Sequence, residues 1–430
     1  MSLKKLGFWQ AVAVGLGNIV GAGIFVMAGA SINAAGPGAL AAFGITAALA
    51  TSVGFNSAEL SSKFPNVEGG VYSFAKATLG DTLGFLVGWF RLISYAVSGS
   101  AVALGFSGYI VAIGVPSGFY LPLAALLILI LSYVEVKGVR LAAEAEEGLV
   151  IINLVGLGLF VATAIGLGTY SSSKFSPAFP NGVGGVFEAA AIAFFAYSGF
   201  NTIATLTPDV ESGERTVPRA IILSLIVSTL LYVLVVFSML YGLNWEAYGV
   251  ASNPLSLTLS SVRAPTPISY AVAFSALTAT LTVTLSLIIA GSRTTRRMGE
   301  DDLLPRFLGK DSKIPTLAVA AIMISSLSLG DVKSIALVAN FGVIFSYMLS
   351  GIEVAVTRKR RVQGKFLSPG YPFTQAFSVA LSAIMLLTLG AQSLAVGTAT
   401  LIVGLLIHSL HKHFVQQTPG YVVDNGQTIL

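Results

Sequence analysis

Two long apolar segments of the chain are each interrupted by small residues, and these interruptions are the positions best suited to bind a small molecule. The first contains Gly21-Ala22-Gly23 and the second contains Ser198-Gly199. An unwound stretch leaves backbone NH and carbonyl groups without helical partners, which a membrane tolerates only where they face protein or a polar cavity. The half-helix after a break presents NH groups and the positive end of its dipole, which suit a carboxylate. Carbonyls that end the preceding half-helix suit an ammonium group, so the breaks together suit a zwitterion.

The same glycines have a simpler interpretation, which is that they only let neighbouring helices pack closely, as small residues do in membranes. One glycine pair alone favours this packing interpretation. Two pairs at corresponding positions of two halves favour a binding site, because paired interruptions are the best sequence indication of a transporter's midplane site.

The composition requires a membrane environment for the elements that carry these breaks. Of 430 residues, 55% are hydrophobic and only 10% are charged, against about 25% charged in an ordinary soluble domain. A water-soluble enzyme is excluded, because so few charges cannot cover a globule of this size. The chain has no cysteine, which excludes disulfides, thiolate metal sites and a cysteine nucleophile.

Apolar windows of about 20 residues, the length that spans a bilayer core, predict twelve membrane helices. We place them at residues 7–30, 37–60, 82–112, 120–138, 147–169, 185–207, 219–242, 267–291, 314–330, 333–356, 373–391 and 394–414. Helices one to five and six to ten form two blocks, and because five is odd the second block enters the membrane in the opposite sense, as in an inverted repeat.

The predicted fold class is therefore an all-α integral membrane protein with a five-plus-five inverted repeat, broken first and sixth helices, and two further C-terminal helices. The predicted organisation is a first repeat at 1–169, a second at 185–356, helices eleven and twelve at 373–414, and a cytoplasmic tail at 415–430.

The basic residues predict the orientation of the chain. With the amino terminus inside, twenty of the 24 Lys and Arg residues fall in cytoplasmic segments, whereas Lys174, Arg263 and Lys333 fall outside and Arg91 lies within the third span. This asymmetry follows the positive-inside rule, so the basic charge indicates orientation and no nucleic-acid partner. We expect a multi-pass protein of the plasma membrane, surrounded by lipid, with both termini cytoplasmic. The first span should be retained, because its apolar run exceeds the roughly 7 to 15 residues of a signal peptide.

Five motifs occur in order along the chain, at residues 17–25, 64–89, 194–201, 211–220 and 293–305. The first includes Gly21-Ala22-Gly23-Ile24-Phe25, and the fourth ends in Pro218-Arg219-Ala220. This ordered set resembles the amino acid-polyamine-organocation superfamily of secondary transporters, of the amino acid permease type.

The resemblance implies that an amino acid binds between helices one and six and is released by alternating access. After Gly21, the NH groups of Ala22, Gly23 and Ile24 would hold the substrate carboxylate. The carbonyls of Ile19, Phe195, Ala196 and Ser198 would hold its amino group, with Gly199 completing the second break. Phe195 is also a candidate aromatic gate, with a packing role as the alternative.

The coupling ion is open at this stage, with Na⁺ and H⁺ as the candidates. Some proton-coupled relatives place a lysine in helix five beside a helix-one carbonyl; the matching residues here are Asn153 and Gly17, and asparagine cannot titrate. The acidic residues of the predicted spans lie at span ends: Glu59, Glu135, Asp209 and Glu353 at the cytoplasmic side and Glu188 at the outer side. None lies near the centre of a span, where a proton-binding group would be expected.

Helix eight offers a sodium site instead. Thr278 and Thr282 share one helix face with Ser286, and their hydroxyls match sodium ligands in sodium-coupled relatives of this fold. The alternatives are that these hydroxyls bond their own backbone, and that transport proceeds by exchange, by facilitated diffusion or along another proton path.

Arg91 is the one basic residue well inside a predicted span. A charge at this depth is a functional hypothesis by default, so Arg91 is expected either to pair with an acidic group or to contact the intracellular pathway. The alternative is that its side chain reaches back to the inner interface.

We therefore expect a secondary active transporter of amino acids, neutral or small ones, and neither an enzyme nor a protein with a cofactor or metal. A polyamine or organic-amine carrier is disfavoured, because dications need acidic side chains near the breaks. An amino acid exchanger stays open as an alternative. An ion channel fits the hydropathy but not the paired breaks, and no enzyme or nucleotide-binding motif lies within the spans.

Overall fold

The computed structural model describes residues 5–65, 70–138, 143–200, 203, 207, 210–249, 251–311 and 313–417. Within these ranges the chain is nearly all helical, and its one β pairing is an isolated parallel bridge between Leu6 and Val210. Asp209 and the predicted tail beyond residue 417 lie outside the described residues.

A helix occupies each segment that was predicted to span the membrane. The first segment forms two helices, α1 (Phe8–Ile19) and α2 (Ala22–Ala35), and the sixth forms α8 (Gly182–Tyr197) and the 3-10 turn η4 (Ser198–Phe200). The others hold α3 (Ala39–Lys63), α5 (Asp81–Ala112), α6 (Tyr120–Val136), α7 (Ala143–Leu167), α10 (Gly213–Gly242), α12 (Thr266–Glu300), α14 (Lys313–Ser326), α15 (Val332–Lys359), α16 (Phe373–Leu387) and α17 (Ala391–Gln417).

Short elements connect these helices. Three are α-helical: α4 (Val71–Leu79), α11 (Pro254–Ser261) and α13 (Phe307–Lys310). Five are 3-10 turns: η1 (Gly36–Gly38), η2 (Ser117–Phe119), η3 (Ser172–Phe175), η6 (Trp245–Tyr248) and η7 (Leu327–Leu329). Among the described residues, nine helical stretches are long and apolar enough to cross a membrane, and three further apolar helices are shorter. The chain is therefore a multi-pass membrane protein.

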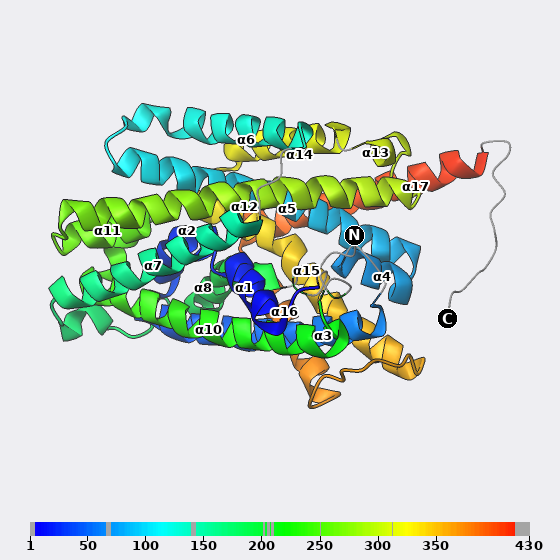
Figure 1. Ribbon diagram of the computed structural model, residues 1–430, viewed down its shortest axis with the longest axis horizontal. Helices are drawn as coiled ribbons and strands as arrows, with labels where there is room; N and C mark the ends of the chain where they lie inside the picture. Colours follow the sequence, from blue (N-terminus) through cyan, green and yellow to red (C-terminus); the bar gives the residue numbers. More distant parts are fainter. Residues whose placement is uncertain are drawn as a thin grey trace.

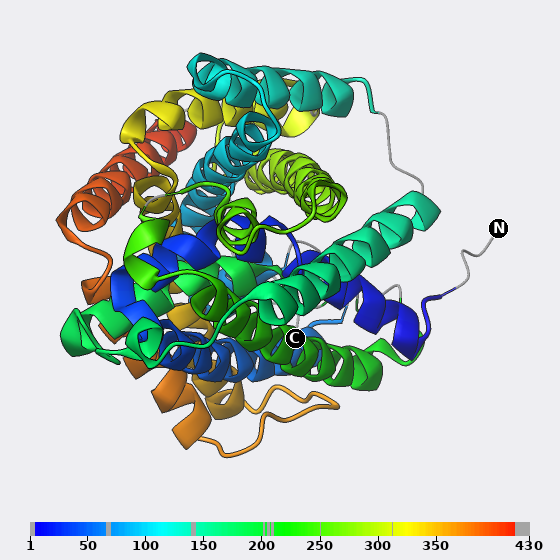
Figure 2. The ribbon, with the colours of Figure 1, turned by 90° about the vertical axis from the view of Figure 1, so that its left-hand side faces the viewer.

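The long helices run roughly along the longest axis of the molecule (Figure 1). α6 and α14 lie side by side along one edge, and α3 and α10 lie side by side along the opposite edge. Between these edges α5 packs against α12 and α15, and α2 packs against α8. Seen nearly end on, the bundle is rounded (Figure 2), and α2 is buried along almost its whole length. The end of α1, α2 and most of α8 are thus buried inside the bundle, where unpaired backbone groups are shielded from lipid.

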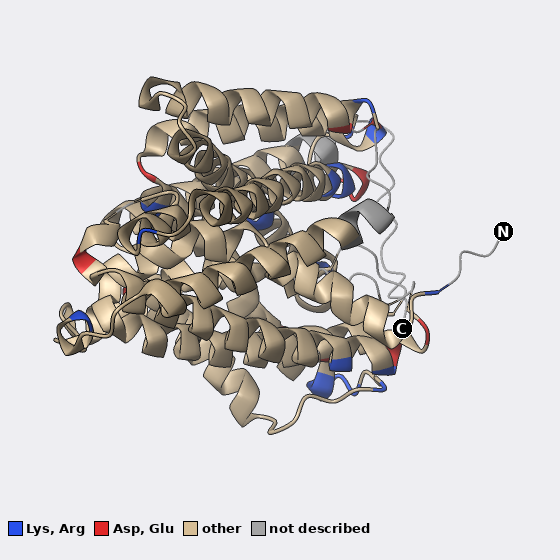
Figure 3. Cartoon of the chain, turned by 60° about the vertical axis from the view of Figure 1, so that its left-hand side comes forward, with Lys and Arg blue, Asp and Glu red and all other residues tan. Residues whose placement is uncertain are grey.

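Charged residues lie mostly toward the two ends of the bundle (Figure 3). Basic residues occupy the last turns of α3, α12 and α15, namely Lys63, Arg297, Arg358 and Lys359. We call the end at which these three helices finish the basic end.

The apolar windows of the sequence do not predict α4, which packs at the basic end. Gly80, with a φ of 87°, separates α4 from α5, and this left-handed conformation is readily available only to glycine. The Tyr72 hydroxyl donates to the Asp301 carboxylate over 2.8 Å, and Lys76 pairs with the same carboxylate over 3.2 Å. Burial, together with Asp301, holds the pKa of Tyr72 above its ordinary value, so the hydroxyl stays protonated and donates.

Candidate functional site

The first break is the junction between α1 and α2. α1 ends at Ile19, the Gly21 NH donates to the Ile19 carbonyl over 2.8 Å, and α2 begins at Ala22 with no side chain capping its N-terminus. The first NH groups of a helix have no partner within it. Ala22, Gly23 and Ile24, the residues predicted to bind a carboxylate, therefore form a buried, uncapped helix N-terminus with a positive dipole end.

The second break follows α8. The α-helix ends at Tyr197, ten residues before the end of the predicted span, and continues as the η4 turn. The Ser198 hydroxyl donates to the Phe195 carbonyl over 3.0 Å, which satisfies part of the helix end. The Phe195 side chain is buried, with 7% of its surface exposed; its role as a gate stays a prediction.

The two breaks touch each other through glycine. A Cβ atom on Gly23 would collide with the Cα of Ala196, and a Cβ on Gly199 would collide with the Asn18 carbonyl oxygen. The backbones of the two interrupted helices thus meet at two points. Glycine is required at both, because any side chain would push the backbones apart. The same glycines therefore allow the helices to pack closely and bring the two breaks together, so the two interpretations of these glycines are compatible.

A tyrosine on α10 joins the two breaks. The Tyr232 hydroxyl lies 2.6 Å from the Ile19 carbonyl oxygen and 3.0 Å from the Ala196 carbonyl oxygen, and the side chain is fully buried. Both acceptors belong to the set predicted to bind an ammonium group. Each carbonyl has two lone pairs. The Ile19 carbonyl also accepts from the Gly21 NH, so an ammonium group would have to replace the Tyr232 hydroxyl there.

A second tyrosine, Tyr347 on α15, contacts the second break. The Tyr347 hydroxyl donates to the Ser198 carbonyl over 3.1 Å. Neither tyrosine was among the predicted site residues, although each lies within an apolar helix where a hydroxyl needs a buried partner. That requirement is the signal that marks them as candidates.

Arg91 is buried, with 6% of its surface exposed, so its side chain does not reach an interface. Its Nη2 donates to the Tyr95 hydroxyl over 2.7 Å, and its guanidinium carbon lies 4.5 Å from the centre of the Tyr95 ring and 5.4 Å from that of Tyr347. Aromatic faces attract a cation in this range. Among the described residues Arg91 has no carboxylate partner. The expected acidic partner is therefore replaced by two tyrosines, and Tyr347 connects Arg91 to the second break.

The predicted coupling-ion residues are partly brought together. The Thr278 hydroxyl donates to Asn153 Oδ1 over 3.0 Å, which joins α12 to α7. Gly17 packs against Val150, about one turn before Asn153 on α7. The Thr282 hydroxyl donates to the Thr278 carbonyl on its own helix over 2.9 Å, as serine and threonine commonly do. Sodium binding at this position stays a prediction.

The site as a whole is a backbone site. It combines helix N-terminal NH groups with carbonyls held by two tyrosine hydroxyls, and it has no charged side chain among residues 17–24 and 195–199. In the part of the chain that the structure describes, no three His, Asp or Glu side chains group as a metal site.

Comparisons with known proteins show a family model and several transporters that this chain resembles. A sequence model of the amino acid permease family matches residues 6–407. The branched-chain amino acid permease BcaP of Bacillus subtilis (strain 168) is 29% identical, over 96% of this chain and 94% of that protein. The methylthioribose transporter of the same organism is 28% identical over 95% and 93% of the two chains. The vacuolar cationic amino acid transporter 4 of Arabidopsis thaliana is 26% identical, over 83% of this chain and 63% of that protein.

Proposed function

Because the chain belongs to the amino acid permease family, we propose that it is a secondary active transporter that carries neutral amino acids across the cell membrane by alternating access. The observation that carries this proposal is the meeting of two helix breaks. The uncapped N-terminus of α2 offers NH groups to a carboxylate, while the carbonyls of Ile19 and Ala196 offer acceptors to an ammonium group.

The preference for neutral substrates follows from the same backbone groups. They recognise what all amino acids share, and residues 17–24 and 195–199 contain no charge to pair with a charged side chain. The likeness to a branched-chain amino acid permease supports an apolar substrate side chain. A polyamine lacks the carboxylate that the α2 N-terminus suits.

The mechanism begins with the tyrosine that bridges the breaks. In the structure the Tyr232 hydroxyl contacts the Ile19 and Ala196 carbonyl oxygens. The amino group of a bound substrate takes over one of these acceptors, and its carboxylate accepts from Ala22, Gly23 and Ile24. Since Gly23 touches Ala196 and Gly199 touches Asn18, movement of one broken helix moves the other. The two helices open together toward one side of the membrane at a time.

The proposed topology has twelve crossings. The nine long apolar stretches and three shorter apolar helices would make two five-helix repeats of opposite orientation, at 1–169 and 185–356, followed by two helices at 373–414. The basic end faces the cytoplasm, because positive residues are retained there, and both chain termini lie on that side.

Coupling to Na⁺ would use Asn153, Thr278 and Thr282 together with the Gly17 carbonyl. The 3.0 Å contact between Thr278 and Asn153 supports a shared polar position on α7 and α12. Exchange of one amino acid for another is the alternative mode and needs no ion.

The test is uptake into liposomes that contain the purified full-length protein. Vesicles preloaded with an unlabelled amino acid are offered labelled leucine, isoleucine, valine, alanine, lysine or putrescine, with methylthioribose as a further arm because of the similar relative. We expect counterflow of neutral amino acids and none of putrescine. Vesicles that exchange no amino acid would overturn the proposal.

A further inference from the structure

Glu353 on α15 is a buried acid without a hydrogen-bond partner. Its side chain is 0% exposed, and within the described part of the chain neither carboxyl oxygen has a hydrogen-bonding or ionic partner. It lies inside an apolar stretch long enough to cross the membrane, six residues before the end of α15 and thus about 9 Å from it along the axis. Glu353 was predicted to lie at the cytoplasmic end of its span, and in the structure it is buried near that end of α15.

The helix geometry shows which elements surround this carboxyl group. Ser350 and Thr357 face α3, because Ser350 accepts from Asn56 over 3.4 Å and Thr357 accepts from Lys63 over 3.0 Å. At 100° per residue, Glu353 lies about 60° from Ser350 around the helix, on the side of Leu349. Leu349 packs in one cluster with Ala75 of α4 and Val87 of α5. Glu353 therefore points toward the junction of α3, α4 and α5.

Most charged groups on these neighbouring elements have other partners, and Asp81 of α5 and Lys359 of α15 are exposed at the helix ends. On α3, Glu59 and Lys63 pair with each other over 2.6 Å. On α4, Tyr72 and Lys76 both contact Asp301, and on α5 Arg91 donates to Tyr95. On α15 itself Arg358 pairs with Glu59, and Lys333 pairs with Glu188 of α8.

Among the described side chains, those of the remaining elements packed against α15 add no partner for Glu353. α2, α16 and η7 contain no ionisable side chain. On α17, His408 stacks on Phe85 and His411 contacts the Asp302 carbonyl. An ionised carboxylate in such surroundings has no compensating charge.

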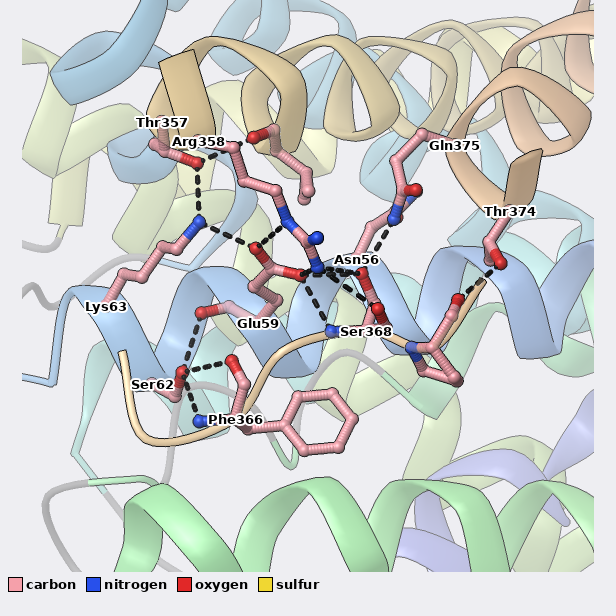
Figure 4. Close-up of polar contacts among 12 residues, drawn as sticks. Asn56, Glu59, Ser62, Lys63, Thr357, Arg358, Phe366, Ser368, Thr374 and Gln375 are labelled. Atoms are coloured by element: carbon pink, nitrogen blue, oxygen red, sulfur yellow. Dashed lines mark hydrogen bonds and ion pairs between the residues drawn. The ribbon is translucent and has the colours of Figure 1, made fainter. Parts of the chain in front are cut away.

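A second buried acid provides the contrast. Glu59 is also fully buried, but its oxygens accept from Lys63, Arg358 and Ser368 over 2.6 to 2.8 Å (Figure 4). That environment matches an ionised carboxylate. Burying a charge without such partners is very costly, whereas the neutral acid is tolerated. Of the two acids, Glu59 has the donors that an ionised carboxylate needs. Glu353 has none among the described residues, so its surroundings suit the neutral, protonated form.

We propose that Glu353 is the proton-binding site through which this protein couples amino acid movement to a proton gradient. The inference rests on the proposed transport function and deepens it by naming the coupling ion. A proton from the outer solution forms an O–H bond with one Glu353 oxygen. On the cytoplasmic side that bond breaks, a water molecule accepts the same proton, and the carboxylate is regenerated, so one proton crosses with each amino acid.

In the structure, one helix connects the proposed proton-binding residue to the substrate site. α15 carries both Glu353 and Tyr347, and the Tyr347 hydroxyl holds the Ser198 carbonyl at the second break. At the basic end the Glu59 cluster, made of Glu59, Lys63, Arg358 and Ser368, binds α3 to α15 (Figure 4). Arg358 lies closer to the end of α15 than Glu353 does. Separation of α15 from α3 admits water to Glu353 and moves Tyr347 at the same time.

The experiment compares wild type, Glu353→Gln and a control, Glu246→Gln, which alters an exposed acid in η6. Each is reconstituted in liposomes, and labelled leucine accumulation is measured with an inward proton gradient, with an inward sodium gradient, and with neither. Leucine counterflow is measured in parallel, because it reports transport without any gradient. We expect the proton gradient to raise accumulation at least tenfold for wild type and for Glu246→Gln. Glu353→Gln should keep its counterflow but lose that stimulation.

Each result decides one claim. Glu353→Gln with wild-type stimulation, or wild type that responds to sodium alone or to neither gradient, overturns the proton site while leaving transport intact. Loss of counterflow in wild type overturns the transport function itself. If Glu353→Gln does not fold, a pH-sensitive dye trapped in wild-type vesicles decides instead: leucine entry must acidify the lumen, and leucine entry without acidification overturns the proposal.

Discussion

The hydroxyl of Tyr232 on α10 lies 2.6 Å from the carbonyl oxygen of Ile19, the last residue of α1. The same hydroxyl is 3.0 Å from the carbonyl oxygen of Ala196, near the end of α8. One side chain therefore satisfies a carbonyl at each of the two breaks. In a membrane protein such carbonyls need a partner, so Tyr232 stabilises the unwound backbone while no substrate is present.

Replacing Tyr232 with phenylalanine removes this bridge without changing the ring. The Ile19 carbonyl keeps its bond from the Gly21 NH, but the Ala196 carbonyl loses its tyrosine partner. A buried carbonyl left unsatisfied costs about 1–3 kcal/mol, and about 1.4 kcal/mol corresponds to a tenfold change. We expect Tyr232→Phe to lower kcat/KM for leucine uptake about tenfold. The control is Tyr248→Phe, whose hydroxyl bonds the Met239 carbonyl away from the breaks. Unchanged uptake kinetics in Tyr232→Phe would contradict the role of the bridge.

The sequence predicts the breaks but not the side chains that complete them. Glycine pairs inside apolar segments can be recognised in the sequence. As predicted, the helix is interrupted at the first pair: α1 ends at Ile19 and α2 begins at Ala22. The roles of Tyr232 and Tyr347 depend on which helices are neighbours, because tertiary packing is what places α10 and α15 beside the breaks. Hydropathy predicts helix positions, but not which face of each helix meets another.

The contact between Gly23 and Ala196 predicts a steric effect at the first break. A Cβ atom on Gly23 would collide with backbone atoms of Ala196, and overpacking of this kind typically costs about 1–3 kcal/mol. We expect Gly23→Ala to abolish most leucine uptake while the protein still inserts in the membrane. Gly44→Ala is the matched control, since a Cβ there meets no atom within 4 Å. Equal uptake by the two variants would show that the close approach is not needed.

The acids illustrate a second limit of prediction from sequence. Glu59 and Glu353 both lie toward the basic end of their helices, and position along a span does not distinguish them. The structure does, because α15 and the segment after it bring Arg358 and Ser368 to Glu59. Glu353 receives no such partner among the described residues. The difference depends on contacts between residues about 300 positions apart in the chain.

Arg91 and Tyr347 should act as a pair. The Arg91 guanidinium lies against the Tyr347 ring, and the Tyr347 hydroxyl holds the Ser198 carbonyl. We expect Arg91→Gln and Tyr347→Phe each to reduce leucine uptake at least fivefold, with the double variant no worse than the more affected single variant, because both disturb one path. Uptake by reconstituted protein, at equal amounts of folded protein, checks this. Multiplied losses in the double variant would show independent roles.

The Glu59 cluster should determine the stability of the basic end. Glu59→Gln keeps the shape of the side chain but leaves Lys63 and Arg358 without their shared carboxylate, and breaking one partner of a buried ion pair costs about 3–5 kcal/mol. Thermal unfolding in detergent, followed by intrinsic fluorescence, should therefore show a clearly lower Tm. Arg306→Gln is the control, because its pair with Asp302 is 61% and 39% exposed and such pairs contribute only about 0–1 kcal/mol. If Glu59→Gln unfolds at the same temperature as Arg306→Gln, the cluster does not stabilise the contact between α3 and α15.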